Sequence, residues 1–199
     1  MIEGGASARI ANPREPALPK SGALLRLIVA YGLFGFGYVI TATFLIAIVR
    51  QEHGSRLFET AVWLVAGLAA APSVFAWAGL ARRFGPAMTF IVTCLVEAIG
   101  VAASVSLGGT AGPLLGALLL GGTFVAATAY GLRAAALLAP DAPRRVFALM
   151  TASFGFGQIV GPIVAGLLAH ETGSYFAASM AASGALIVAA AIAWPRPAA

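Results

Sequence analysis

Charged residues are scarce in this chain, and acidic residues are the scarcest. Only 10% of the 199 residues are charged, with 12 basic and 7 acidic side chains, whereas 60% are hydrophobic. A soluble domain of this length needs far more polar surface to face water. The composition therefore excludes a soluble globular fold and predicts an all-α integral membrane protein.

Cysteine and clusters of metal-binding residues are also nearly absent. The single cysteine, Cys94, has no partner in the chain, which excludes an internal disulfide. His53 and His170 have no neighbours at the spacing of metal ligands, and no nucleophile with a base or phosphate-binding loop is found. We expect no enzyme activity, no cofactor and no metal.

Long apolar runs fill most of the chain. Six stretches are close to the roughly 20 residues that a helix needs to cross the hydrocarbon core. They are residues 27–49, 61–81, 87–107, 114–132, 147–169 and 176–194. Backbone amides in lipid must be satisfied within a segment, so we predict six transmembrane helices in a bundle over residues 24–194. Residues 1–23 are predicted to be a disordered cytosolic tail, and residues 195–199 a short cytosolic one.

The placement of basic residues predicts the orientation. Ten of the twelve lie on one side of the predicted bundle, whereas Arg50 and Arg56 lie in the first loop on the other side. The ten are Arg9, Arg14, Lys20, Arg26, Arg82, Arg83, Arg133, Arg144, Arg145 and Arg196. The positive-inside rule then predicts a multi-pass plasma (inner) membrane protein with both termini in the cytosol. Because no basic stripe has interleaved aromatic residues, we do not expect nucleic-acid binding.

The first stretch is rich in glycine, hydroxyl and aromatic residues. It contains the run YGLFGFGY, from Tyr31 to Tyr38, followed by Thr41 and Thr43. A helix lining a solute cavity has this composition, and so does a helix that packs closely through small residues. We interpret Tyr31 as an interfacial residue and Tyr38, in mid-span, as part of a cavity together with Thr41 and Thr43.

The fourth stretch has a related composition. The run GGTF ends at Phe124, and Thr128 and Tyr130 follow. This similarity to the first stretch suggests a three-plus-three inverted repeat, an arrangement common in secondary transporters. Thr123, Phe124 and Thr128 are candidate solute-binding residues.

The fifth stretch adds a polar side chain beside a proline. Gly157 and Gly161 form a GxxxG pair that allows a neighbouring helix to approach closely, and Pro162 removes a helical hydrogen bond. Gln158 either binds solute or caps a freed carbonyl group.

Glu97 is the only acidic residue well inside a predicted span. Burying a charge there costs on the order of 3 kcal/mol on insertion scales. It is either a proton-coupling residue or a neutral carboxyl group that hydrogen-bonds an adjacent helix. On the second interpretation, Glu97→Gln would leave transport and its pH dependence nearly unchanged.

Several of these segments together resemble a known family. The run YGLFGFGY, the run ATFL at 42–45, the run GGTF at 121–124 and residues 151–162 are similar to the second half of major facilitator superfamily transporters of the YbfB/YjiJ type. The run AGLARRFG at 78–85 resembles the superfamily's signature loop. Arg82 and Pro86 depart from that loop, and Thr41 and Ile46 stand where prolines are expected.

The resemblance implies a secondary transporter of a small solute, with an architecture of two six-helix halves. This chain would supply one half, so the expected partners are lipid, solute and a second half, from another copy or a separate chain. The alternative is a truncated or accessory membrane protein without transport activity. An upstream reading frame encoding six spans would favour the transporter.

Overall fold

The computed structural model describes residues 15–51 and 55–195, and it is entirely α-helical in those ranges. The helices, in chain order, are α1 Gly22–Gln51, α2 Arg56–Ala70, α3 Ser73–Ala76, α4 Ala78–Ser106, α5 Ala111–Leu138, α6 Pro143–Thr172 and α7 Phe176–Ala193. Five of them, α1, α4, α5, α6 and α7, are long and apolar enough to cross a membrane. His53 and the predicted tail residues Arg9, Arg14 and Arg196 lie outside the described residues.

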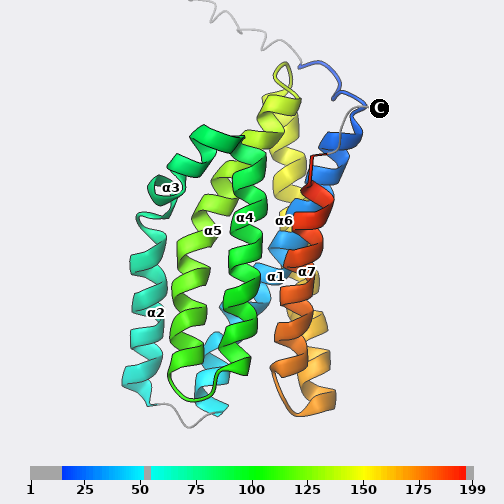
Figure 1. Cartoon of the computed structure of the whole chain (residues 1–199). Helices are drawn as coiled ribbons and strands as arrows, with labels where there is room; N and C mark the ends of the chain where they lie inside the picture. Colours follow the sequence, from blue (N-terminus) through cyan, green and yellow to red (C-terminus); the bar gives the residue numbers. More distant parts are fainter. Residues whose placement is uncertain (1–14, 52–54, 196–199) are drawn as a thin grey trace, which may run out of the picture.

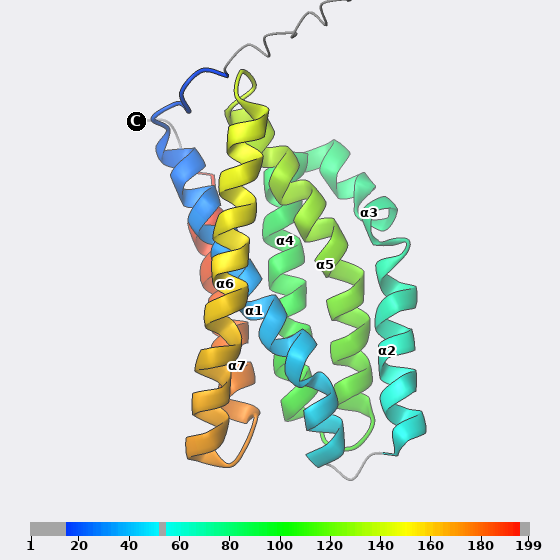
Figure 2. The same cartoon turned by 180° about the vertical axis from the view of Figure 1, so that it is seen from behind.

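The helices form one bundle with two distinct faces. Helix α1 packs on α6, α7 and α5, while α5 also packs on α4 and α2, and α4 packs on α7. Figure 1 shows the face formed by α4 and α7. Figure 2 shows the opposite face, where α1 crosses obliquely between α6 and α5 with α2 beyond.

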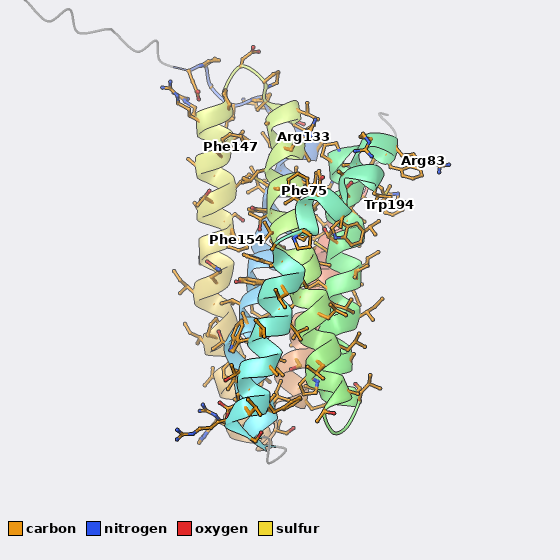
Figure 3. The ribbon with its side chains drawn as sticks, turned by 90° about the vertical axis from the view of Figure 1, so that its left-hand side faces the viewer. Phe75, Arg83, Arg133, Phe147, Phe154 and Trp194 are labelled. Atoms are coloured by element: carbon orange, nitrogen blue, oxygen red, sulfur yellow. The ribbon has the colours of Figure 1, made fainter. Side chains whose placement is uncertain are left out.

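The described chain begins and ends at the same end of the bundle, which we call the terminal end (Figure 1). Arg83 and Arg133 lie near this end together with Trp194 (Figure 3). Arg50 and Arg56 lie at the opposite end, where α1 stops and α2 starts. The predicted separation of basic residues is thus present in the fold.

The prediction of one continuous helix over residues 61–81 is wrong. Helix α2 ends at Ala70, the short α3 follows, and Trp77 separates α3 from α4. Pro72 stands at the break; it has no N–H to donate to the preceding turn, and its ring clashes with that turn. A second change of direction lies inside α4 at Gly85, whose φ of 84° is one that L-residues with a side chain rarely adopt. The second predicted span is therefore a broken segment, distributed over α2, α3 and the start of α4.

Small residues allow α1 and α6 to touch along their lengths. A Cβ atom added to Gly157 would collide with the carbonyl oxygen of Gly32, and one added to Gly161 would lie 2.8 Å from Val39 Cγ1. The close-packing role predicted for the GxxxG pair is confirmed. The glycines of the first span have the same role, because a Cβ atom on Gly37 would lie 2.7 Å from Leu186 of α7.

Candidate functional site

Aromatic rings from α1, α4, α5 and α6 meet in the middle of the bundle. The rings of Tyr38 and Phe124 stack with their centroids 4.0 Å apart and their planes 12° apart. Phe34 lies 5.9 Å from Phe90 and 5.5 Å from Phe154, again between ring centroids. Phe154 lies well below Phe147 along α6 in Figure 3. Such offset and tilted contacts stabilise aromatic pairs beyond the area they bury.

Tyr31 belongs to this aromatic cluster. Its side chain is buried, its ring contacts Phe34, Phe90 and Phe154, and its hydroxyl donates to the carbonyl oxygen of Thr128 at 3.3 Å. The prediction that Tyr31 is interfacial is therefore wrong. The position of a tyrosine along a span does not show which way its side chain points.

A small open cavity of about 160 Å³ lies between α1, α2 and α5, and we call it the groove. Two of the predicted solute-binding residues, Tyr38 and Phe124, line it. The complete lining is Tyr38, Ala42, Trp63, Ala66, Gly67, Ala70, Leu120, Gly121 and Phe124. No charged side chain is among them, so the groove suits an apolar or aromatic group better than an ion.

Helix α5 and helix α2 approach closely at the floor of the groove. A Cβ atom added to Gly121 would collide with the carbonyl oxygen of Ala66. Close to this contact, Trp77 Nε1 donates to the carbonyl oxygen of Gly122 at 2.7 Å, and the Tyr130 hydroxyl donates to that of Val74 at 2.9 Å. These bonds tie the broken second segment to α5.

The predicted threonines do not form one site. Thr41 and Thr128 each donate to a carbonyl oxygen one turn earlier in their own helix, at 3.4 Å from Gly37 and 2.9 Å from Phe124. This is the usual local bond of a threonine within a helix. Thr43 is exposed, outside the lining of the groove.

Gln158 is half-buried on α6, beside Gly157, and is likewise not part of the groove lining. Helix α6 continues through the neighbouring Pro162 to Thr172. The structure therefore brings together Tyr38 and Phe124 but leaves Thr41, Thr43, Thr128 and Gln158 apart from them.

Glu97 and Thr123 form a second feature, between α4 and α5. Glu97 is fully buried, and its Oε2 atom lies 3.0 Å from Thr123 Oγ1. Its other carboxyl oxygen, Oε1, is buried without a hydrogen-bond partner in the described part of the chain. A buried polar atom without a partner is uncommon and points to strain, water or function.

Trp63 is an aromatic residue of the groove that was not among the solute-binding residues predicted from the sequence. It is 45% exposed and lines the groove together with Tyr38 and Phe124. The spacing of Trp63, Gly67 and Ala70 by four and three residues places them on one helical face, and this is the signal that was available.

A larger recess of about 660 Å³ lies at the end of the bundle opposite the terminal end. Its lining includes Phe44, Arg50, His170 and Tyr175, and none of the predicted solute-binding residues. Arg50 is held in an ion pair with Glu59, with Nε and Oε1 2.8 Å apart, and so is not free to bind an anion. We therefore place the candidate site in the groove.

Comparison with known proteins agrees with this membrane architecture. A family model described as "Uncharacterised MFS-type transporter YbfB" matches residues 3–194. A search of curated proteins finds no match. The family is one of transporters and not of enzymes, and its model covers nearly the whole chain. This chain is a multi-pass membrane protein that belongs to the YbfB family of transporters of the major facilitator type.

Proposed function

We propose that this chain forms one six-helix half of a secondary transporter and that its groove contacts the solute. The observation that carries the proposal is the groove itself, a small apolar space lined by the stacked rings of Tyr38 and Phe124 and by Trp63. Pockets for small molecules are generally apolar, with a few placed polar groups. The Tyr38 hydroxyl and the Trp63 indole N–H supply such groups here.

The packing pattern supports the three-plus-three repeat. Helix α1 packs on α6 and α7, and α5 packs in the corresponding way on the α2 segment and on α4. In such a repeat α1 corresponds to α5, the α2 segment to α6, and α4 to α7. The contacts of α1 with α6 and α7 then correspond to the contacts of α5 with the α2 segment and α4. An inverted repeat of this kind places a solute site where the two triplets meet. The groove lies near that boundary, between α1, α2 and α5.

The orientation and the partner are parts of the same proposal. Both termini would lie in the cytosol, with the basic terminal end inside. Labelling of cysteines introduced at Ser55, Gly109 and Gly173 from outside the cell would test this. The face in Figure 2, with α1, α2, α5 and α6, would pair with a second six-helix half, from another copy or a separate chain.

The test is solute flux in cells that produce variants at equal membrane levels. Candidate solutes are a panel of labelled small molecules, both uncharged and charged. Tyr38→Ala and Trp63→Ala should reduce the flux of the transported compound about two- to twelvefold, because one aromatic contact contributes about 0.5–1.5 kcal/mol. Phe147→Ala is the control, because Phe147 is 41% exposed on α6 and lies outside the groove.

The same assay ranks the other predicted residues. Gln158→Ala tests whether the half-buried amide contributes to flux from outside the groove. Flux that is unchanged in both Tyr38→Ala and Trp63→Ala would remove the groove from the path. Absence of flux for the whole panel would favour an accessory protein without transport activity.

A further inference from the structure

We propose that Glu97 and Thr123 form a proton-binding switch between α4 and α5, which makes the proton the coupling ion of the proposed transporter. This inference rests on the proposed function, because a coupling ion has meaning only where a solute moves. It is carried by three observations: the complete burial of the Glu97 side chain, the limited bonding capacity of the Thr123 hydroxyl, and the position of Thr123 next to the groove.

Within the described residues, no basic side chain forms an ion pair with Glu97. The helices that pack on α4 are α5, α7, α1 and α3, and neither α7 nor α3 contains a titratable residue. Helix α5 contributes Tyr130 and Arg133, which lie seven and ten residues beyond Thr123. Helix α1 contributes Tyr38, whose ring stacks on Phe124 of α5.

The remaining charged and titratable groups of α1 and α4 are not paired with Glu97 either. Tyr31 of α1 donates its hydroxyl hydrogen to the carbonyl oxygen of Thr128, and Cys94 is a free, buried cysteine one turn before Glu97. Arg26 lies in the second turn of α1, and Arg82 and Arg83 lie in the first two turns of α4, far along that helix from Glu97. The described ion pairs join Arg50 to Glu59 and Arg144 to Glu15, so neither involves Glu97. An ionised Glu97 in this packing would be a buried charge without a counter-ion, which is strongly disfavoured.

The Thr123 hydroxyl cannot serve two acceptors at once. Its Oγ1 atom lies 2.6 Å from the carbonyl oxygen of Leu119 and 3.0 Å from Glu97 Oε2, and a hydroxyl has a single hydrogen. When Glu97 is protonated, its O–H donates to Thr123 Oγ1, and Thr123 donates to Leu119. When the carboxyl O–H bond breaks and the proton passes to water, Thr123 must turn its hydrogen to the carboxylate and release Leu119.

This exchange of hydrogen bonds lies one residue from the groove. Phe124 follows Thr123 on α5, and its ring stacks on Tyr38, which lines the groove with it. Loss of the proton leaves a carboxylate whose Oε1 atom has no hydrogen-bond partner in the described packing. The ionised state therefore favours an arrangement of α4 and α5 that admits water to this atom. Proton release is thereby linked to a change in the groove wall.

A first experiment measures protonation without any solute. Purified protein in lipid is examined by infrared difference spectroscopy, which detects the carbonyl stretch of a protonated carboxyl group. The wild type should show one such band that disappears at high pH, and Glu97→Gln should lack it. Thr123→Val should shift the band, and Thr123→Ser should restore its position because the hydroxyl is retained. Glu171→Gln, a change at an exposed glutamate, is the matched control and should keep the band.

A second measurement tests the link to the groove. A cysteine is introduced at Ala42 in a Cys94→Ala background, and its rate of reaction with a water-soluble maleimide is followed against pH. The rate should change several-fold over the pH range in which the infrared band disappears, and Glu97→Gln should abolish this change. A wild-type spectrum without a Glu97 band would overturn the proposal, as would a pH-dependent rate that persists in Glu97→Gln.

These readouts separate the switch from transport itself. If the band and the maleimide rate titrate together but no solute flux is found, the proton-binding site stands and the transport proposal fails. If flux is found and Glu97→Gln keeps its full dependence on the proton gradient, transport stands and the switch is rejected.

Discussion

Single glycine residues determine how closely α1 and α6 approach. Gly157→Ala adds a Cβ atom against the carbonyl oxygen of Gly32 and 2.7 Å from the backbone nitrogen of Phe36, so the two helices must move apart. Overpacking of this kind costs about 1–3 kcal/mol, and we expect a lower midpoint of thermal unfolding in mild detergent. Gly166→Ala is the control on the same helix, because a Cβ atom there meets nothing within 4 Å. Equal midpoints for the two variants would contradict this packing role.

The residue scale is also where the sequence was least informative. Residue type suggested that Thr41, Thr128 and Tyr38 act together, but two of the three hydroxyls bond to their own helix. In lipid a hydroxyl without a water partner takes the nearest carbonyl oxygen, so composition alone does not identify a polar cavity. Tyr38 and Phe124 were predicted because a solute cavity in an apolar bundle needs aromatic faces, and both residues line the groove. The helical spacing of Trp63, Gly67 and Ala70 indicated a shared face, but only the tertiary structure shows that this face lines the groove.

Helix α6 begins at a cap that comes from a distant part of the chain. The Glu15 carboxylate accepts hydrogen bonds from the backbone N–H groups of Arg144 and Arg145, both at 3.1 Å. A carboxylate at this position satisfies donors that the helix itself cannot, and such caps contribute about 1 kcal/mol. Glu15→Ala should therefore lower the unfolding midpoint. Glu171→Ala, at the other end of α6, should not lower it, since a negative charge near a helix C-terminus is not stabilising.

An ion pair joins the end of α1 to the start of α2. Two hydrogen bonds of 2.8 Å from the Arg50 guanidinium hold the pKa of the Glu59 carboxyl group below its ordinary value. A group with a lowered folded-state pKa contributes stability above its unfolded pKa, and this contribution is lost as the pH falls through the folded-state value. Arg50→Gln should lower the unfolding midpoint slightly at neutral pH, and its difference from the wild type should vanish in acid and shrink in high salt. Arg133→Gln is the control, and an Arg50→Gln effect that does not vary with pH would argue against the pair.

At the scale of elements, the sequence predicted most of the helices correctly. Runs of apolar residues near the length of a bilayer located α1, α4, α5, α6 and α7, because lipid leaves the backbone little alternative to a helix. The second segment was mispredicted because hydropathy does not register Pro72, whose effect is on backbone geometry. Two prolines have different effects: α6 continues through Pro162, whereas α2 ends two residues before Pro72. The surrounding packing decides between these outcomes, and it is not visible in the local sequence.

At the scale of the whole molecule, helix α6 exposes large apolar side chains along much of its length. Helix α6, which is in front in Figure 2, has a stripe of exposed apolar side chains with spacings of three and four residues. The stripe consists of Phe156, Ile159, Ile163 and Leu167, which are 58–69% exposed. Lipid can cover such a stripe, but a path for a solute needs a second wall.

We therefore expect the α6 stripe to face a second six-helix half and the isolated chain to be inactive. Ile163→Cys in a Cys94→Ala background should cross-link in native membranes, either to another copy or to a separate chain of different mass. Ile187→Cys is the matched control, because Ile187 is 50% exposed and lies on α7, a helix that is in front in the opposite view (Figure 1). Cross-linking at both positions would indicate nonspecific crowding. Solute flux by demonstrably monomeric protein in liposomes would show that one half suffices, since no second wall would then be present to enclose the groove between α1, α2 and α5.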